Sequence, residues 1–111
     1  MRQFVENYPY GSNRGSITPQ PPDYVDARVL SAGSAKRHAV PEGARFVSFS
    51  ATMDFYALFG DSSVVAAVPS TDVTNGTAPE LNPMARKIPD ATTHISLVAE
   101  AAGKVTLSFW S

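Results

Sequence analysis

Apolar side chains occupy every odd position of the stretch from Val47 to Phe59, and most of the even positions between them are polar. A period of two residues is typical of a β-strand, in which successive side chains point to opposite faces of a sheet. The stretch is longer than an average strand of about five or six residues, so we predict two strands, or one strongly bent strand, divided near residues 52–54. The odd positions predicted to point into the core include Val47, Phe49, Met53, Phe55 and Phe59.

Shorter stretches elsewhere show the same alternation or a high content of β-forming residues. Residues 64–68 (VVAAV) predict a short strand, and residues 93–100 and 104–110 predict a β-hairpin. Residues 27–30 and 37–40 predict edge strands around the turn SAGSA. No part of the chain has a helical period. Several short strands separated by turn residues predict an all-β fold, either an antiparallel β-sandwich or a jelly-roll-like barrel.

The first 27 residues differ from the rest because they show neither alternation nor a helical period. Such a segment cannot bury a core of its own, but it carries aromatic and apolar side chains that need a surface to pack on. We therefore predict an extended N-terminal arm over residues 1–27 and a β-sandwich domain over residues 28–111. The alternative is a chain end without fixed structure. The arm residues expected to bind a partner are Phe4, Tyr8, Tyr10, Ile17 and Tyr24.

Residues 68–83 (VPSTDVTNGTAPELNP) consist largely of turn-forming residue types. The three prolines restrict the backbone and Gly76 permits a reversal, so we predict a stiff loop. A stiff loop loses little entropy when an interface immobilises it, which favours a contact surface. Asp and Asn side chains close local turns, and the segment lacks the spaced carboxylates of a calcium loop, so we expect turns and no metal. The contact residues predicted here are Asp72, Asn75 and Glu80.

The charges of the chain are nearly balanced, with nine Lys and Arg against ten Asp and Glu. This balance argues against direct nucleic-acid binding, because a protein that neutralises many phosphates is basic. No apolar stretch approaches the roughly 20 residues that span a bilayer, so we expect no membrane contact and a soluble chain made in the cytoplasm. No Lys or Arg lies between Arg45 and Arg86, where four acidic residues occur. This segregation indicates either a polarised surface or chance.

The sequence offers no recognisable catalytic constellation. His38 and His94 are isolated from each other and from other ligand-type residues, so we expect hydrogen-bonded strand histidines rather than a metal site or a general base. There is no cysteine, and no serine lies in a G-x-S-x-G context. We therefore expect a protein that is not an enzyme, with no catalytic residue, no metal and no cofactor.

Three stretches, in this order, resemble a recurrent module of tailed-phage virion proteins: VPEGARFVSFSATMDFYALFG, AAVPSTDVTNGTAPELNP and THISLVAEAAGKVTLSFWS. In length and arrangement the chain resembles the capsid decoration proteins, also called staple or cement proteins, of epsilon-fifteen-like short-tailed bacteriophages. The match runs from about Val40 to the end, so the N-terminal arm lies outside it.

The resemblance implies a non-enzymatic β-sandwich on the outer surface of an icosahedral capsid. There it would join neighbouring major capsid protein subunits and resist the pressure of the genome. It also implies a homodimer at two-fold positions of the shell, and it carries over no catalytic residue. The alternative is a receptor- or glycan-binding β-module of a virion fibre or head-fibre protein. Exposed aromatic residues and a ligand pocket would favour this alternative.

Overall fold

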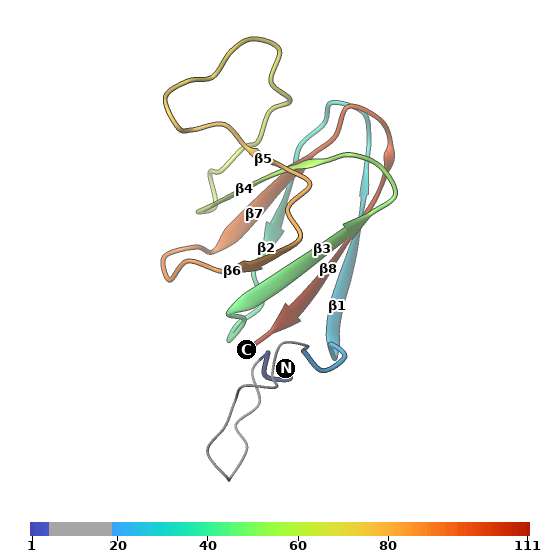
Figure 1. Cartoon of the computed structure of the whole chain (residues 1–111), viewed down its shortest axis with the longest axis vertical. Helices are drawn as coiled ribbons and strands as arrows, with labels where there is room; N and C mark the ends of the chain where they lie inside the picture. Colours follow the sequence, from blue (N-terminus) through green and yellow to red (C-terminus); the bar gives the residue numbers. More distant parts are fainter. Residues whose placement is uncertain (5–18) are drawn as a thin grey trace.

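The computed structural model of the chain describes residues 1–4 and 19–111 (Figure 1). The predicted arm residues Tyr8, Tyr10 and Ile17 therefore lie outside the described residues. The described part contains eight strands and no helix. The strands are β1 (Tyr24–Leu30), β2 (Lys36–Ala39), β3 (Phe46–Ala51), β4 (Tyr56–Gly60), β5 (Glu80–Leu81), β6 (Ala85–Lys87), β7 (His94–Val98) and β8 (Gly103–Trp110).

The strands form two antiparallel sheets that pack face to face, with the strand orders β1-β8-β3-β6 and β2-β7-β4-β5. The first strand pairs with the last, the second with the seventh, the third with the sixth and the fourth with the fifth. A long antiparallel ribbon rolled up on itself gives this order, which is that of a jelly roll. The prediction of an all-β sandwich of jelly-roll type is confirmed.

The core lies between the two sheets and is built from residues that alternate along their strands. Val47 and Phe55 are fully buried there, and the chain divides between Ala51 and Tyr56, as the alternation predicts. Phe49, Met53 and Phe59 also pack against the core but are only partly buried. Replacing Phe49 with alanine should therefore cost less than the roughly 3–5 kcal/mol of a fully buried phenylalanine.

The hairpin predicted over residues 93–110 is wrong, because its two strands belong to different sheets. β7 pairs with β2 and β4, whereas β8 pairs with β1 and β3. The two strands instead face each other across the core, where Leu97 and Leu107 are both fully buried. The alternation of apolar and polar residues determines which side chains of a strand point inward. It does not determine which other strand pairs with that strand in a sheet.

The strand predicted over residues 64–68 is also absent, although the segment is close to the sandwich. The Ala66 N–H donates to the Oγ of Ser96, a side chain on the outer face of β7 (2.8 Å). The segment thus lies over the face of a sheet rather than beside a strand edge. Among the described strands, none pairs with the backbone of this segment, so it forms no ladder.

Both predicted edge strands are confirmed, since β1 and β2 each border one sheet. However, β1 begins at Tyr24, so residues 24–27 of the predicted arm belong to the sandwich. The start of the chain is also tied to its end: the Phe4 N–H donates to the Ser111 carbonyl (3.0 Å), and the Ser111 N–H donates to the Arg2 carbonyl (2.9 Å). Residues 2–4 and the C-terminus therefore form one structural unit.

Candidate functional site

The β4–β5 loop, residues 61–79, contains the longest continuous run of exposed residues in the described chain. We call residues 61–68 the stem and residues 69–78 the tip, which Pro79 follows. Every residue of the tip is exposed. Figure 1 shows the loop in yellow to orange at one end of the sandwich, with the two termini at the other end. The tip lies within the segment predicted to be a stiff contact loop.

The stem begins with a turn closed by Asp61. The Ser63 hydroxyl and N–H both donate to Asp61 Oδ1, at 2.6 and 2.9 Å, and they hold the pKa of Asp61 below its usual value. Gly60 permits this turn, because a Cβ there would lie 2.8 Å from the Cβ of Val64. The Arg37 guanidinium, reaching across from β2, donates to the carbonyl of Ser62. The stem is therefore held at its first turn by both local and distant hydrogen bonds.

The rest of the stem contacts the outer face of β7. Ser96 and Val98 alternate with the core residues Ile95 and Leu97 and so belong to this outer face, yet both are buried. Ala66, whose N–H binds the Ser96 hydroxyl, is itself only 2% exposed. The stem thus forms a third layer over β7.

The chain returns from the tip through Asn82, which has a left-handed backbone conformation (φ 48°). Its Oδ1 accepts from the Phe55 N–H (3.0 Å), its own N–H donates to the Phe55 carbonyl (2.8 Å), and its Nδ2 donates to Asp54 (2.9 Å). Asparagine tolerates this conformation better than most residues. Both sides of the tip are therefore fixed to the sandwich.

Within the tip, Asn75 closes a turn as predicted. The Thr77 hydroxyl and N–H donate to Asn75 Oδ1 at 2.6 and 3.3 Å, and Gly76 adopts a positive φ of 83°. A hollow of about 290 Å³ lies at the base of the tip, and all of its lining residues are uncharged. The lining residues are Leu58, Val65, Ala67, Val68, Pro69, Ser70, Thr71, Val73, Thr77, Ala78 and Pro79. Residues from both sides of the loop thus meet around one largely apolar base.

The predicted contact residues have different environments. Asp72 is exposed at the tip, while Asn75 serves the turn. Glu80 is engaged with Arg86, which donates to both carboxylate oxygens at 3.0 and 2.5 Å. These hydrogen bonds lower the pKa of Glu80 and raise that of Arg86. The pair joins β5 to β6 across one side of the sandwich, so Glu80 has a structural role that the sequence did not indicate.

The two described aromatic residues of the predicted arm also pack within the chain. Phe4 stacks on Phe46 with ring centroids 4.6 Å apart and meets the edge of Trp110 at 5.4 Å. Tyr24 lies edge-on to Phe109 at 5.9 Å while remaining 41% exposed. Phe4 is therefore an internal anchor of the N-terminus, and Tyr24 retains a partly free surface.

The histidines take up the hydrogen-bonded strand positions that the sequence predicts. His38 Nε2 lies 2.8 Å from Asp26 Oδ2, which joins β2 to β1 across the side of the sandwich opposite the Glu80–Arg86 pair. His94 Nδ1 lies 2.9 Å from the Thr93 hydroxyl. Over residues 1–4 and 19–111, no three His, Cys, Asp or Glu side chains gather as a metal site would require.

Among residues 1–4 and 19–111, no segment covers most of the outer face of the β1-β8-β3-β6 sheet, and we call this part the bare face. Register and alternation place on it Val25, Ala27, Val29, Ser48, Ser50, Ala85, Lys104, Thr106 and Ser108. Lys104, opposite Val29, is the charged side chain of this set. The end near Phe46 and Trp110 is covered by Phe4 and by Gln20, whose carbonyl accepts from the Trp110 ring N–H (2.9 Å).

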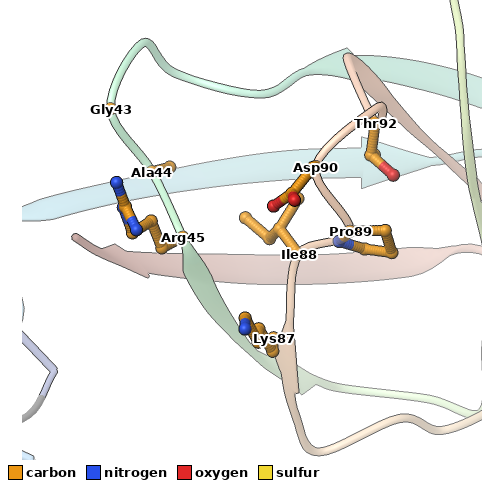
Figure 2. Close-up of a pocket in the computed structure, with 8 residues that line it drawn as sticks. All are labelled: Gly43, Ala44, Arg45, Lys87, Ile88, Pro89, Asp90 and Thr92. Atoms are coloured by element: carbon orange, nitrogen blue, oxygen red, sulfur yellow. The ribbon is translucent and has the colours of Figure 1, made fainter.

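A hollow of about 550 Å³ lies beside β6, between the start of β3 and the β6–β7 connection (Figure 2). Arg45 and Lys87 border it on one side, and Asp90 and Thr92 on the other. The buried Ile88 contributes an apolar part of the wall. This hollow offers charged and hydroxyl groups but includes no aromatic residue among those that line it.

Comparison with protein-family models, with curated proteins and with solved structures finds no match to this chain. Within the described ranges 1–4 and 19–111, no helix has the length and apolar character needed to cross a membrane.

Proposed function

We propose that this chain is a non-enzymatic structural protein of a bacteriophage particle. It decorates the outer surface of an icosahedral capsid and staples neighbouring major capsid protein subunits, which stabilises the shell against genome pressure. The observation that carries the proposal is the tip of the β4–β5 loop. Every residue from 69 to 78 is exposed. Before the tip, the chain is fixed to the sandwich by the hydrogen bond between Ala66 and Ser96, and after it by the hydrogen bond between Asn82 and Phe55.

This arrangement suits a contact element for a physical reason. A loop that is ordered before binding loses less conformational entropy on binding than a free segment does. The tip presents hydroxyls, small apolar side chains and a single carboxylate, Asp72. Such a surface fits a protein partner through shape and hydrogen bonds rather than through strong charge attraction.

The position of the tip also supports a stapling role. The tip and the two termini lie at opposite ends of the sandwich (Figure 1). A rigid β-sandwich with one contact element at each end can bridge two neighbouring capsid subunits. In the proposal, the tip contacts one subunit and the N-terminal end contacts the next, and two copies pair at two-fold positions of the shell.

The fold and the sequence resemblance add support of a weaker kind. Jelly rolls occur in viral capsid proteins but also in lectins and enzymes, so the fold by itself assigns no function. The resemblance to phage decoration proteins covers the three stretches that contain β3, β4, the tip, β7 and β8. The proposed localisation on the virion surface rests on that resemblance.

The test uses shells assembled from the major capsid protein of the same phage genome, without the decorating chain. The wild-type chain is compared with a variant in which residues 70–78 are replaced by a short Gly-Ser link. A Val29→Ser variant on the bare face serves as the matched control. We expect the wild type and the control to bind and to raise the temperature of genome release, and the loop variant to remain folded but lose binding. Unchanged binding by the loop variant, or no binding by the wild type, would contradict the proposal.

A second candidate function is binding of a glycan by a fibre or head-fibre protein, and the hollow beside β6 favours it. Arg45, Asp90 and Thr92 are side chains that can hydrogen-bond sugar hydroxyls. A glycan array with the wild type and an Asp90→Ala variant tests this function. Binding that the substitution removes would support it, and an array without signal would refute it.

A further inference from the structure

The tip of the β4–β5 loop carries an asparagine followed directly by a glycine, Asn75–Gly76, and both residues are exposed. We propose that this pair is a site of spontaneous covalent modification, at which the Asn75 amide is converted to aspartate or isoaspartate through a cyclic imide. This inference does not depend on the proposed function, because the reaction needs only the chain itself and water.

The reaction is an intramolecular acyl transfer followed by hydrolysis. The backbone nitrogen of Gly76 attacks Cγ of Asn75, which forms a C–N bond and closes a five-membered succinimide ring. The Cγ–Nδ2 bond breaks, and Nδ2 leaves as ammonia with the proton that the Gly76 nitrogen gives up. Water then adds to either ring carbonyl and opens the ring. The products are an aspartate or an isoaspartate at position 75, with no oxidant or further reactant required.

The nucleophile in this reaction is unusually accessible. Gly76 has no side chain to block the approach of its nitrogen to Cγ, and no residue other than its two chain neighbours has a heavy atom within 4 Å of the position that a Cβ would occupy. Within the described part of the chain, no hydrogen-bond acceptor holds the Gly76 N–H. The backbone nitrogen is therefore free to lose its proton to solvent base and to react.

The electrophile is activated by Thr77. The Thr77 hydroxyl lies 2.6 Å from Asn75 Oδ1, and the Thr77 N–H donates to the same oxygen at 3.3 Å. When the Gly76 nitrogen attacks, negative charge develops on Oδ1. Two donors aimed at that oxygen stabilise the developing charge in the manner of an oxyanion hole. The turn that closes the tip thus also polarises the carbonyl that reacts.

Asn82 provides an internal comparison in the same chain. It precedes Pro83, whose ring nitrogen carries no hydrogen and cannot close the imide by this route. The Nδ2 of Asn82, which would have to leave, is also held by Asp54. The geometry therefore selects Asn75 over Asn82.

The modification changes the tip in two ways. An aspartate or isoaspartate is ionised at neutral pH, which adds a negative charge three residues from Asp72. Isoaspartate also lengthens the backbone by one methylene at the turn. A tip that serves as a contact surface would be altered in both charge and shape.

The experiment incubates the full chain at neutral and mildly alkaline pH and follows each asparagine by peptide mapping with mass spectrometry and by an enzymatic isoaspartate assay. We expect conversion at Asn75, faster at the higher pH because the attacking nitrogen must be deprotonated, and none at Asn82. Asn75→Gln should abolish the signal, since a longer side chain closes a less favourable six-membered ring. Conversion of Asn75 only after denaturation would show that the folded loop protects it and would overturn the proposal.

A second variant tests the role of Thr77 separately. Thr77→Val keeps the shape of the side chain but removes its hydroxyl donor, so we expect conversion of Asn75 to slow several-fold. Conversion at the parent rate or faster would refute activation by the hydroxyl. Both measurements are made on the free chain, so their outcome is independent of whether the chain binds a capsid.

Discussion

The two sheets of the sandwich differ in what lies on their outer faces. On the β2-β7-β4-β5 sheet, the stem of the β4–β5 loop forms a third layer, and Ser96 and Val98 are buried although they point away from the core. On the β1-β8-β3-β6 sheet, no described segment covers most of the corresponding face, and Val29 remains 60% exposed. The difference shows how the chain fixes the β4–β5 loop: the stem packs on the outer face of one sheet, and the tip remains exposed.

The largest difference in stability between substitutions on the two outer faces is expected when an aspartate replaces a valine. Val98→Asp places a carboxylate at a position on the outer face of β7 that is only 2% exposed, where its desolvation should cost several kcal/mol. Val29→Asp places the same group in solvent, so it should cost about 1 kcal/mol or less, mainly through lower β propensity. Urea unfolding of both variants measures the difference. Equal losses of stability would mean that the stem does not cover β7 in solution.

A smaller effect is expected from a matched pair of serines. Ser96→Ala removes the acceptor of the Ala66 N–H and leaves a buried donor without a partner, which should cost about 1–3 kcal/mol. Ser108→Ala on the bare face should change the free energy of unfolding by no more than about 0.5 kcal/mol. Chemical denaturation gives both values. A neutral Ser96→Ala would indicate that another group satisfies Ala66.

Phe4 covers one end of the otherwise open face, so its removal extends the bare face. Phe4→Ala loses the stacking on Phe46 and the edge contact with Trp110, and we expect a cost of about 1–2 kcal/mol. Trp110 fluorescence should shift to longer wavelength as the indole gains solvent. An unchanged emission spectrum would show that Phe4 does not rest on Trp110.

The smallest effect concerns the first turn of the stem at acid pH. The Ser63 donors lower the pKa of Asp61 in the folded chain below its usual value of 3.8. The stabilisation from this turn is therefore complete above that value and is lost as the pH falls through the folded-state pKa. Asp61→Asn does not titrate, so the stability difference between parent and variant should shrink below about pH 3.8. A difference independent of pH would rule out this contribution.

Much of the fold could be predicted from the sequence, because alternation reports directly on which side chains a sheet buries. The division between β3 and β4, the edge strands β1 and β2, and the inward positions Val47 and Phe55 all follow from that pattern. The pairing of β7 and β8 could not be predicted, because two strands that face each other across a core alternate in the same way as two strands of a hairpin.

The candidate site was predictable only in part. The three prolines and the Asn75–Gly76 pair mark the tip as a loop, and the turn at Asn75 follows from known side-chain preferences. The residues that fix the stem were missed, because Ser96 and Asn82 are distant in sequence from the groups they bind. Glu80 was predicted to be a contact residue because the sequence does not show that Arg86 lies opposite it. Phe4 was likewise assigned to a partner because Trp110 lies at the other end of the chain.

Hydroxyl-radical footprinting of the chain, free and bound to capsid shells, tests most directly whether the tip is the contact surface. Val73 in the tip is 43% exposed and Val29 on the bare face is 60% exposed, so both side chains should react in the free protein. We predict that shell binding protects Val73 from oxidation and leaves Val29 unchanged. Protection of Val29 with Val73 still reactive would move the contact to the bare face and contradict the proposed role of the tip.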